Sequence, residues 1–184
     1  KAQLKKTERE FYDLMTSLDF LPNSPTLFNA GRELQQLAAC FVLPVEDNLD
    51  DIFKALYYAA KISKSGSGTG FNFSKLRPRN DVIKSVTGFS SGPTSFMKMF
   101  DSVTEQIRLG GLRRGALMGI LRVDHPDIEE FITIKSREEK ALENFNISVA
   151  ITHKFMESVK GNKDYWLINP RNSKKVRKEN AGRI

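Results

Sequence analysis

The sequence predicts an α/β fold, and two observations lead to that prediction. Short apolar segments with the length and composition of strands recur along the chain, at residues 37–45, 116–123 and 144–151. Amphipathic segments, whose apolar residues have helical spacing, stand between them. The 184 residues are 40% hydrophobic and 28% charged, which suits a globular domain large enough to bury a core without disulfides or metal ions.

The first third of the chain predicts one helix and one strand. Residues 3–18 carry Leu4, Phe11 and Leu14 at helical spacing and predict an amphipathic helix. We expect no regular element in the segment that follows, because two prolines and a glycine interrupt it. Residues 37–45 form a short apolar run that Pro44 ends, and they predict a buried strand.

The middle of the chain predicts two helices separated by a loop. Residues 47–66 begin with acidic residues and end with lysines and Gly66, the order that complements a helix dipole. The segment 63–79, SKSGSGTGFNFSKLRPR, is rich in glycine, and we expect it to be a flexible loop. Residues 90–111 predict a second helix with Pro93 in its first turn.

Two further helices and a strand are expected towards the end. Asp124 is the expected cap of a short helix after the strand at 116–123. Thr152 is the expected cap of the last helix, and Gly161 ends it. Residues 165–170 predict one more strand, and we expect no element in the basic tail that follows.

Charge and cysteine content narrow the classes of partner. The formal charge of +7 and the pI near 9.5 favour anionic partners, namely nucleotides, nucleic acid or acidic lipid. A single cysteine excludes an internal disulfide and favours a cytoplasmic location. Two histidines without a His/Cys cluster argue against a metal site, and no apolar run approaches the roughly 20 residues of a membrane helix.

Two glycine-rich segments with arginines are candidate phosphate sites. The first lacks the Lys-Ser or Lys-Thr pair of a P-loop and the third glycine of the dinucleotide fingerprint. Four basic residues follow its glycines: Lys75, Arg77, Arg79 and Lys84. The second, GGLRRG at 110–115, surrounds Arg113 and Arg114 with glycines. Together they favour a nucleoside triphosphate, although solvated connections between helices are the alternative.

Two other features admit a functional and a structural interpretation. Asp47, Asp50 and Asp51, at the start of a predicted helix, are candidates to accept a hydrogen bond from a ribose hydroxyl, but acidic residues are common at helix starts. Cys40 lies in a predicted buried strand, and no basic residue within three positions would lower its pKa. A core cysteine and a reactive thiol therefore both remain open from the residues alone.

Six consecutive segments resemble the large chain of ribonucleotide reductases, most closely the vitamin-B12-dependent class. They are FLPNSPTLFNAG, QLAACFVLPVEDNLDDIF, KSGSGTGFNFSKLRP, SSGPTSFMKMFDSVTEQI, GGLRRGALMGILRVDHPDIEEFI and NFNISVAIT. Their order and spacing agree with that family over residues 7–172.

The resemblance implies an architecture and a set of partners. It implies part of a ten-stranded α/β barrel: a leading helix and first barrel strand at about 1–45, a helical effector and dimer region at about 46–115, and further strands and helices at 116–184. It implies a homodimer that reduces ribonucleotides, adenosylcobalamin as cofactor, deoxynucleoside triphosphates or ATP as allosteric effectors, and a thioredoxin- or glutaredoxin-type reductant.

The resemblance also implies roles for seven residues. Cys40 corresponds to one member of the redox dithiol. The effector-binding positions are Asp47 for the ribose and Arg77 and Lys84 for the phosphates. The substrate-binding positions are Thr26, Ala39 and Arg114, of which Ala39 replaces a serine found in some relatives.

One departure from the family pattern limits what we expect of the chain. The second redox cysteine and an NPCGE-like segment with the radical cysteine are missing, and we expect both downstream of Ile184 in a longer parent. Because two electrons are needed to remove the 2′-hydroxyl, one cysteine does not suffice, and the chain alone is expected to be inactive. The alternatives are a non-catalytic nucleotide-binding or regulatory module and a basic nucleic-acid-binding protein. The absence of an aromatic and basic stacking stretch argues against nucleic acid.

Overall fold

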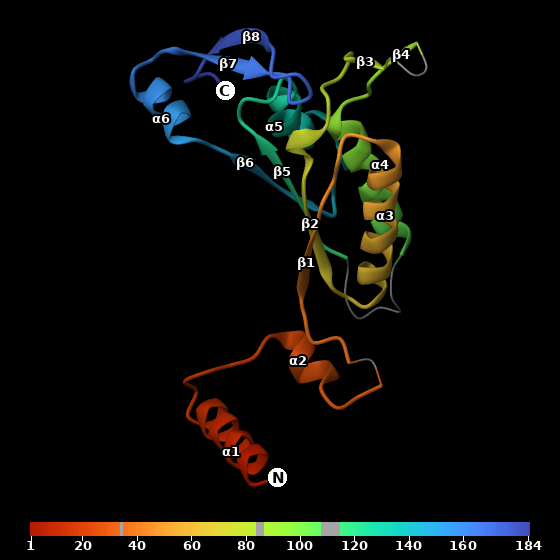
Figure 1. The fold of residues 1–184 in the computed structure, drawn as a ribbon, viewed down its shortest axis with the longest axis vertical. Coiled ribbons are helices and arrows are strands. Elements are labelled where there is room, and N and C mark those ends of the chain that lie inside the picture. The colour runs from red at the N-terminus through yellow and green to blue at the C-terminus, as the bar shows by residue number, and fades with distance from the viewer. Residues whose placement is uncertain (34, 84–86, 108–114) are drawn as a thin grey trace. The chain divides into compact units, whose positions relative to one another are not determined.

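The computed structural model describes residues 1–33, 35–83, 87–107 and 115–184 (Figure 1). The chain forms two compact units, Lys1–Ala39 and Cys40–Ile184.

The first unit holds two helices, α1 (Ala2–Thr16) and α2 (Ser24–Asn29). The amphipathic helix expected at the start of the chain is present as α1, and none of its residues is buried. The expectation of no regular element in the next segment was wrong. Pro25 lies in the first turn of α2, where its missing N–H costs nothing, and the Asn23 side chain accepts a hydrogen bond from the Thr26 amide at 3.0 Å.

The second unit is built on a four-stranded parallel sheet. Its strands, in the order β1-β2-β5-β6, are β1 (Cys40–Leu43), β2 (Gly68–Asn72), β5 (Leu117–Arg122) and β6 (Phe145–Ala150). The connections between them contain three helices: α3 (Leu49–Lys64), α4 (Pro93–Gln106) and α5 (Ile128–Arg137).

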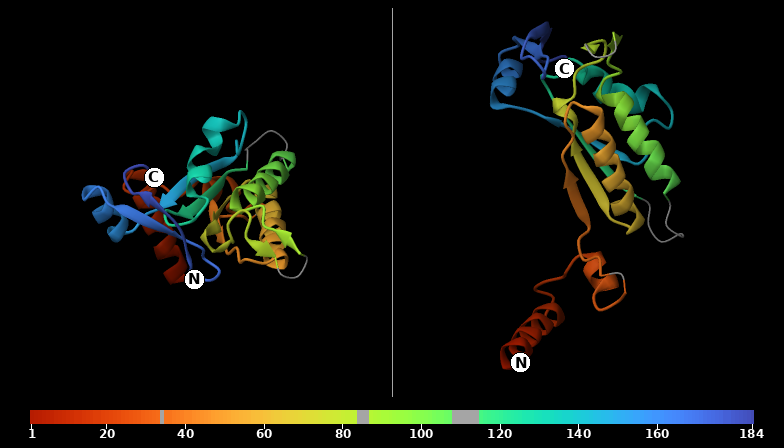
Figure 2. Two further views of the ribbon diagram at one scale, coloured as in Figure 1. Left: turned by 90° about the horizontal axis from the view of Figure 1, so that it is seen from above. Right: turned by 45° about the vertical axis from the view of Figure 1, so that its right-hand side comes forward.

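The helices form one layer on one face of this sheet (Figures 1 and 2), with α3 packed against α4 and α4 against α5. Strands that follow chain order, with all their crossover helices on one face, are the arrangement of an α/β barrel wall rather than of a doubly wound sheet. The predicted α/β class is confirmed in this coarser form.

The glycine-rich segment contains a strand near the middle of the sheet, so the prediction of a flexible loop was wrong. Gly68 and Gly70 belong to β2, which pairs with β1 on one side and β5 on the other. Thr69 and Phe71 alternate with these glycines and are 3% and 2% exposed. A Cβ atom on Gly68 would lie 3.0 Å from the Ala116 carbonyl oxygen. Gly68 therefore allows close backbone approach within the sheet.

The core lies between the sheet and its helix layer. Phe71 of β2 and Phe73, which directly follows β2, pack on Phe100 of α4, with ring centroids 4.8 and 5.8 Å apart. Phe145 of β6 completes this aromatic cluster. The opposite face of the sheet is open at its β1 edge, where Val42 is 84% exposed.

The remaining elements differ from expectation at two points. Helix α5 begins at Ile128, with Asp127 at the cap position, so the expectation that Asp124 caps it was wrong. Helix α6 (His153–Lys160) begins and ends as predicted. Strand β7 (Asp164–Ile168) is also confirmed, but the basic tail forms a further strand, β8 (Lys175–Asn180), antiparallel to it.

Three short elements complete the second unit: η1 (Phe73–Lys75), β3 (Val82–Ile83) and β4 (Gly88–Phe89). Within the described parts of the chain, no helix has both the length and the apolar character needed to cross a membrane.

Candidate functional site

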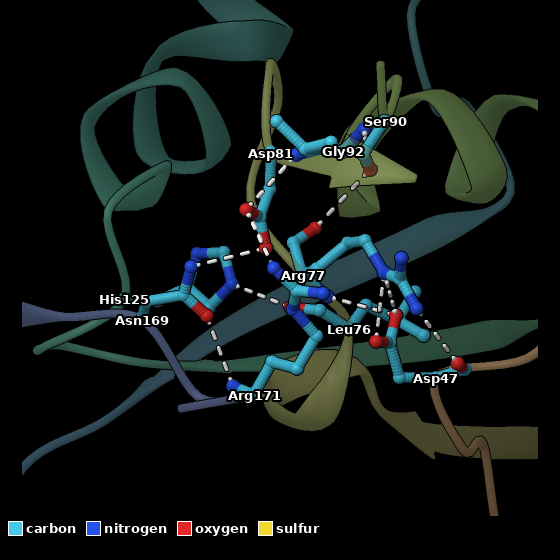
Figure 3. Close-up of polar contacts among 10 residues, drawn as sticks. Asp47, Leu76, Arg77, Asp81, Ser90, Gly92, His125, Asn169 and Arg171 are labelled. Carbon is cyan, nitrogen blue, oxygen red and sulfur yellow. Dashed lines mark hydrogen bonds and ion pairs between the residues drawn. The ribbon is translucent and has the colours of Figure 1, made fainter. Parts of the chain in front are cut away.

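Asp47 and Arg77 form an ion pair at the carboxyl-terminal edge of the parallel sheet (Figure 3). Asp47 follows β1 and Arg77 follows η1 at the end of β2, and because these strands are parallel neighbours, their ends meet at one edge. Arg77 Nε lies 2.8 and 3.1 Å from the two Asp47 carboxylate oxygens. The Arg77 amide also donates to Asp47 Oδ1 at 3.0 Å. The two side chains are 21% and 22% exposed, so the pair is partly shielded yet reachable from solvent.

The pair lies on the wall of a cavity of about 580 Å³, here called the Asp47–Arg77 cavity. Its wall combines apolar and charged side chains from the start of α3, from the β3 and β4 segment, from α4 and from the turn after β7, including Ile52, Phe89, Phe96 and Arg171. Such a volume, with apolar walls and a few convergent polar groups, is typical of a small-molecule site.

Asp81 fixes one wall of this cavity. Its carboxylate accepts hydrogen bonds from the Val82 amide at 3.0 Å, from Asn169 Nδ2 at 3.1 Å and from Arg171 Nη2 at 3.0 Å. Burial alone would raise the pKa of Asp81, but the hydrogen bond from Asn169 and the charge of Arg171 lower it below its ordinary value. Asp81 therefore stays ionised and ties the segment after Arg77 to the turn after β7 (Figure 3).

His125 holds the backbone beside Arg77 through a hydrogen bond to Leu76. The ring is 1% exposed, and the Asp127 amide donates to its Nδ1 at 3.1 Å. Nε2 therefore carries the proton and donates to the Leu76 carbonyl at 2.9 Å. Burial lowers the pKa of His125 below its ordinary value, although the hydrogen bond to Leu76 and the Asp127 carboxylate act the other way. The ring is thus a neutral structural link.

Asp127 and Glu130, at the start of α5, contact the residues on either side of the β3 and β4 segment. Asp127 Oδ2 accepts from the Arg79 amide at 2.8 Å, and Glu130 forms contacts with both Arg79 and Thr94. Burial raises the pKa of Asp127, against the hydrogen bond from the Arg79 amide. Arg79, before β3, and Thr94, in the first turn of α4, are consequently both anchored to the start of α5.

Cys40 is exposed, so the expectation of a buried strand position was wrong for this residue. It begins β1, the edge strand of the sheet, and pairs in register with Gly68. Because a glycine stands beside it and its face of the sheet is not covered by the helices, the thiol is accessible. Cys40 and Asp47 lie at opposite ends of β1, so the thiol does not belong to the Asp47–Arg77 cavity.

The other predicted site residues fall into two groups. Thr26 and Ala39 belong to the first unit, where Thr26 Oγ1 contacts the Leu37 carbonyl and Asn23 Oδ1 at 3.2 and 2.7 Å. Lys84 and Arg114 lie outside the described residues.

Sequence reasoning missed Arg171, Asp81 and His125 as residues of this region. A polar cluster directly after a predicted strand, as in the NPRN segment that contains Arg171, is the signal that could have drawn attention to it. Among the described residues, no three His, Cys, Asp or Glu side chains are grouped so as to hold a metal ion.

Comparison with known families and proteins agrees with this architecture. Residues 38–183 match the family model for the ribonucleotide reductase barrel domain, and residues 3–35 match that for the ribonucleotide reductase all-alpha domain. The two matched ranges correspond closely to the two compact units of the structure.

Individual relatives carry the same family name. The chain is 55% identical over 175 residues, 95% of its length, to a vitamin B12-dependent ribonucleoside-diphosphate reductase of Thermoplasma acidophilum. It is 44% identical over 180 residues, 98% of its length, to the protein of that name from Mycobacterium tuberculosis. It is 32% identical over 166 residues, 88% of its length, to a ribonucleoside-diphosphate reductase subunit alpha of Bacillus subtilis. The chain spans 23%, 26% and 24% of these relatives, about a quarter of each. The barrel-domain match covers most of the chain, and the chain therefore belongs to the family of ribonucleotide reductase large chains.

Proposed function

We propose that the chain is part of a cobalamin-dependent enzyme that reduces ribonucleotides to deoxyribonucleotides, and that it carries that enzyme's regulatory nucleotide site. The observation that supports this most is the partly shielded Asp47–Arg77 pair on the wall of a cavity of about 580 Å³. The names of the B12-dependent relatives support the activity and the cofactor.

In the proposed site, Arg77 binds phosphate and Asp47 accepts a hydrogen bond from a sugar hydroxyl. A guanidinium offers five N–H donors in a planar fork, and a carboxylate only accepts, which matches the charge distribution along a nucleotide. The two groups satisfy each other without ligand, so neither is left as an unpaired charge. Lys84 is proposed as a second phosphate contact, and deoxynucleoside triphosphates or ATP as the ligands.

An apolar stripe on α3 supports a dimer beside this cavity. Leu49, Phe53 and Tyr57 follow one another at four-residue spacing and are 62%, 53% and 55% exposed. Large apolar side chains gathered on one helix face are typical of a protein interface. Leu49 also lines the cavity, so the proposed homodimer face and the nucleotide site adjoin.

Cys40 is proposed as one of two thiols that supply electrons to the substrate. Replacing the 2′-hydroxyl by hydrogen consumes two electrons and releases water, while two thiols become one disulfide. The chain has one cysteine, so the second thiol must come from another polypeptide segment, and a thioredoxin- or glutaredoxin-type protein would reduce the disulfide. Thr26, Ala39 and Arg114 are proposed substrate contacts.

We also propose that the chain belongs to a ten-stranded barrel, with a leading helix and first strand up to about residue 45, a helical effector and dimer region up to about residue 115, and further barrel strands and helices after it. The described residues do not form a site that fits adenosylcobalamin. The two ring nitrogens of buried His125 are both engaged, and the Asp47–Arg77 cavity has the size of a nucleotide site. The cofactor would supply the radical chemistry.

Titration of dTTP against the chain and its Arg77→Ala variant tests the proposed site. We expect the variant to bind about tenfold to a hundredfold more weakly, because a charge-assisted phosphate contact is lost. Arg177→Ala is the matched control, since Arg177 also pairs with a carboxylate, Glu129, but does not line the cavity. Its affinity should be unchanged.

A single-stranded oligonucleotide in the same titration addresses the nucleic-acid alternative. Affinity that grows with oligonucleotide length and falls steeply with salt, without a response to dTTP, would replace the nucleotide-site proposal. Equal dTTP affinity of the wild-type chain and Arg77→Ala would contradict the role of Arg77.

A further inference from the structure

We propose that Arg171 is an additional phosphate contact of the nucleotide site, held by Asp81 until the ligand replaces that carboxylate as its partner. The proposal rests on the proposed nucleotide site and adds to it a residue from a distant part of the chain.

The backbone around Arg171 is held rigidly in the turn between β7 and β8. The Arg171 amide donates to Asn169 Oδ1 at 3.0 Å. Asn169 itself bonds through its backbone to Lys174 and Ser173 at 2.9 and 2.8 Å, and Ile168 bonds to the Asp124 carbonyl. A side chain projecting from such a turn is directed by its backbone, which lowers the entropy lost when a ligand binds it.

The Arg171 side chain lines the Asp47–Arg77 cavity. It also lines a neighbouring cavity of about 680 Å³, together with Lys75 and Arg122. Its side chain is 30% exposed, comparable with the 21% of Arg77, so both guanidinium groups are accessible from solvent. Figure 3 shows that they reach this region from different elements, Arg77 from the end of β2 and Arg171 from the turn after β7.

The ion pair of Arg171 with Asp81 can be exchanged without leaving a stranded carboxylate. Asp81 keeps hydrogen bonds from Asn169 and from the Val82 amide when Arg171 turns away. The bond given up joins Arg171 Nη2 to Asp81 Oδ1 at 3.0 Å. A polyphosphate oxygen is an equally suitable acceptor and binds guanidinium groups in a bidentate manner. When phosphate replaces the carboxylate, Arg171 therefore keeps a charged hydrogen-bond acceptor, and Asp81 keeps its hydrogen bonds from Asn169 and the Val82 amide.

A purely structural role for Arg171 makes a different prediction. If Arg171 only tethers the loop through Asp81, then removing either partner breaks the same tether and weakens nucleotide binding equally. If Arg171 contacts phosphate, removing Asp81 releases the arginine for the ligand and also removes a negative charge near the phosphates.

The experiment compares dTTP affinity of Arg171→Ala and Asp81→Asn, with Arg77→Ala and Arg177→Ala measured alongside. We expect Arg171→Ala to bind dTTP about tenfold or more weakly, and Asp81→Asn to bind as tightly as the wild-type chain or more tightly. Circular dichroism establishes that each variant is folded. If Asp81→Asn is not folded, Arg171→Lys replaces it, and retention of the charge should give an affinity between those of wild type and Arg171→Ala.

Three results would overturn the inference. Unchanged affinity in Arg171→Ala, with a loss in Arg77→Ala, would remove Arg171 from a nucleotide site that itself stands. An equal loss in Arg171→Ala and in Asp81→Asn, or in Arg171→Lys where that variant is used, would assign Arg171 a tethering role. No dTTP binding by the wild-type chain would overturn both the inference and the proposed nucleotide site.

Discussion

On the helix-covered face of the sheet, phenylalanine rings pack edge to face around Phe100, whereas at the carboxyl-terminal edge of the same strands hydrogen bonds and ion pairs hold the loops. The core groups are fully removed from water, and the charged groups of the edge keep 14–30% of their side-chain surface exposed. Burial therefore dominates the stability of the first region. The second region keeps polar groups within reach of a ligand, and its contacts contribute mainly to positioning.

The largest difference between the two regions should appear when one phenylalanine is truncated in each. Phe100 is 0% exposed, and we expect Phe100→Ala to lower the free energy of unfolding by about 3–5 kcal/mol. Phe89 lines the cavity and is 70% exposed, so Phe89→Ala should change the free energy by less than about 0.5 kcal/mol. Urea unfolding of both variants measures the difference. Similar losses would show that the edge loops are part of the same tightly packed core.

A glycine pair tests how tightly the edge loop is anchored. Gly92 has a φ of +79°, and a Cβ there would lie 2.8 Å from Asp127 Oδ2 and 3.1 Å from the Arg79 amide nitrogen. Gly66 has a φ of +78° but open space around it. We expect Gly92→Ala to destabilise the chain by about 2–3 kcal/mol and Gly66→Ala by about 1 kcal/mol, because only the first adds a clash to the backbone strain. Equal losses of stability in the two variants, measured by thermal unfolding, would mean that the loop shifts easily enough to relieve the clash at Gly92.

The pH dependence of stability reports on the buried histidine link. Because burial lowers the pKa of His125 in the folded chain below 6.5, the unfolded chain binds a proton more readily. Its contribution is therefore present above pH 6.5 and is lost as pH falls through the lowered folded pKa. His125→Gln should reduce the loss of stability on acidification. The quantity measured is the difference in unfolding free energy between variant and wild type at several pH values. A pH profile that His125→Gln leaves unaltered would exclude a neutral, buried His125.

Sequence reasoning predicted the elements whose patterns are local. Strand β5 is mostly apolar and strand β6 alternates apolar with polar residues at first, and the cap at Thr152 bonds to the Phe155 amide as expected. Strand β2 was missed because its glycines suggest a loop. The alternation of Thr69 and Phe71 with glycines, which gives the strand one buried face, is the signal that could have identified it. Strand β8 was missed because its residues are polar and its stability comes from pairing with β7.

The site was predictable only in part. The resemblance indicated Asp47 and Arg77, and the structure places them together, since each follows one of two adjacent parallel strands. The exposure of Cys40 depends on the position of β1 at the sheet edge, which the local sequence does not reveal. Arg171 approaches Asp81 through the folding of a hairpin far along the chain, so no local pattern could have paired them.

Hydrogen exchange with and without dTTP tests most directly whether the Asp47–Arg77 cavity is a nucleotide site. A bound nucleotide should slow amide exchange in peptides covering residues 47–52 and 76–83, because these segments line the cavity and the Arg77 amide already belongs to its hydrogen-bond network. Peptides from α6, away from the cavity, should exchange at the same rate in both conditions. Protection confined to other parts of the chain, or no protection at saturating dTTP, would contradict the proposed site.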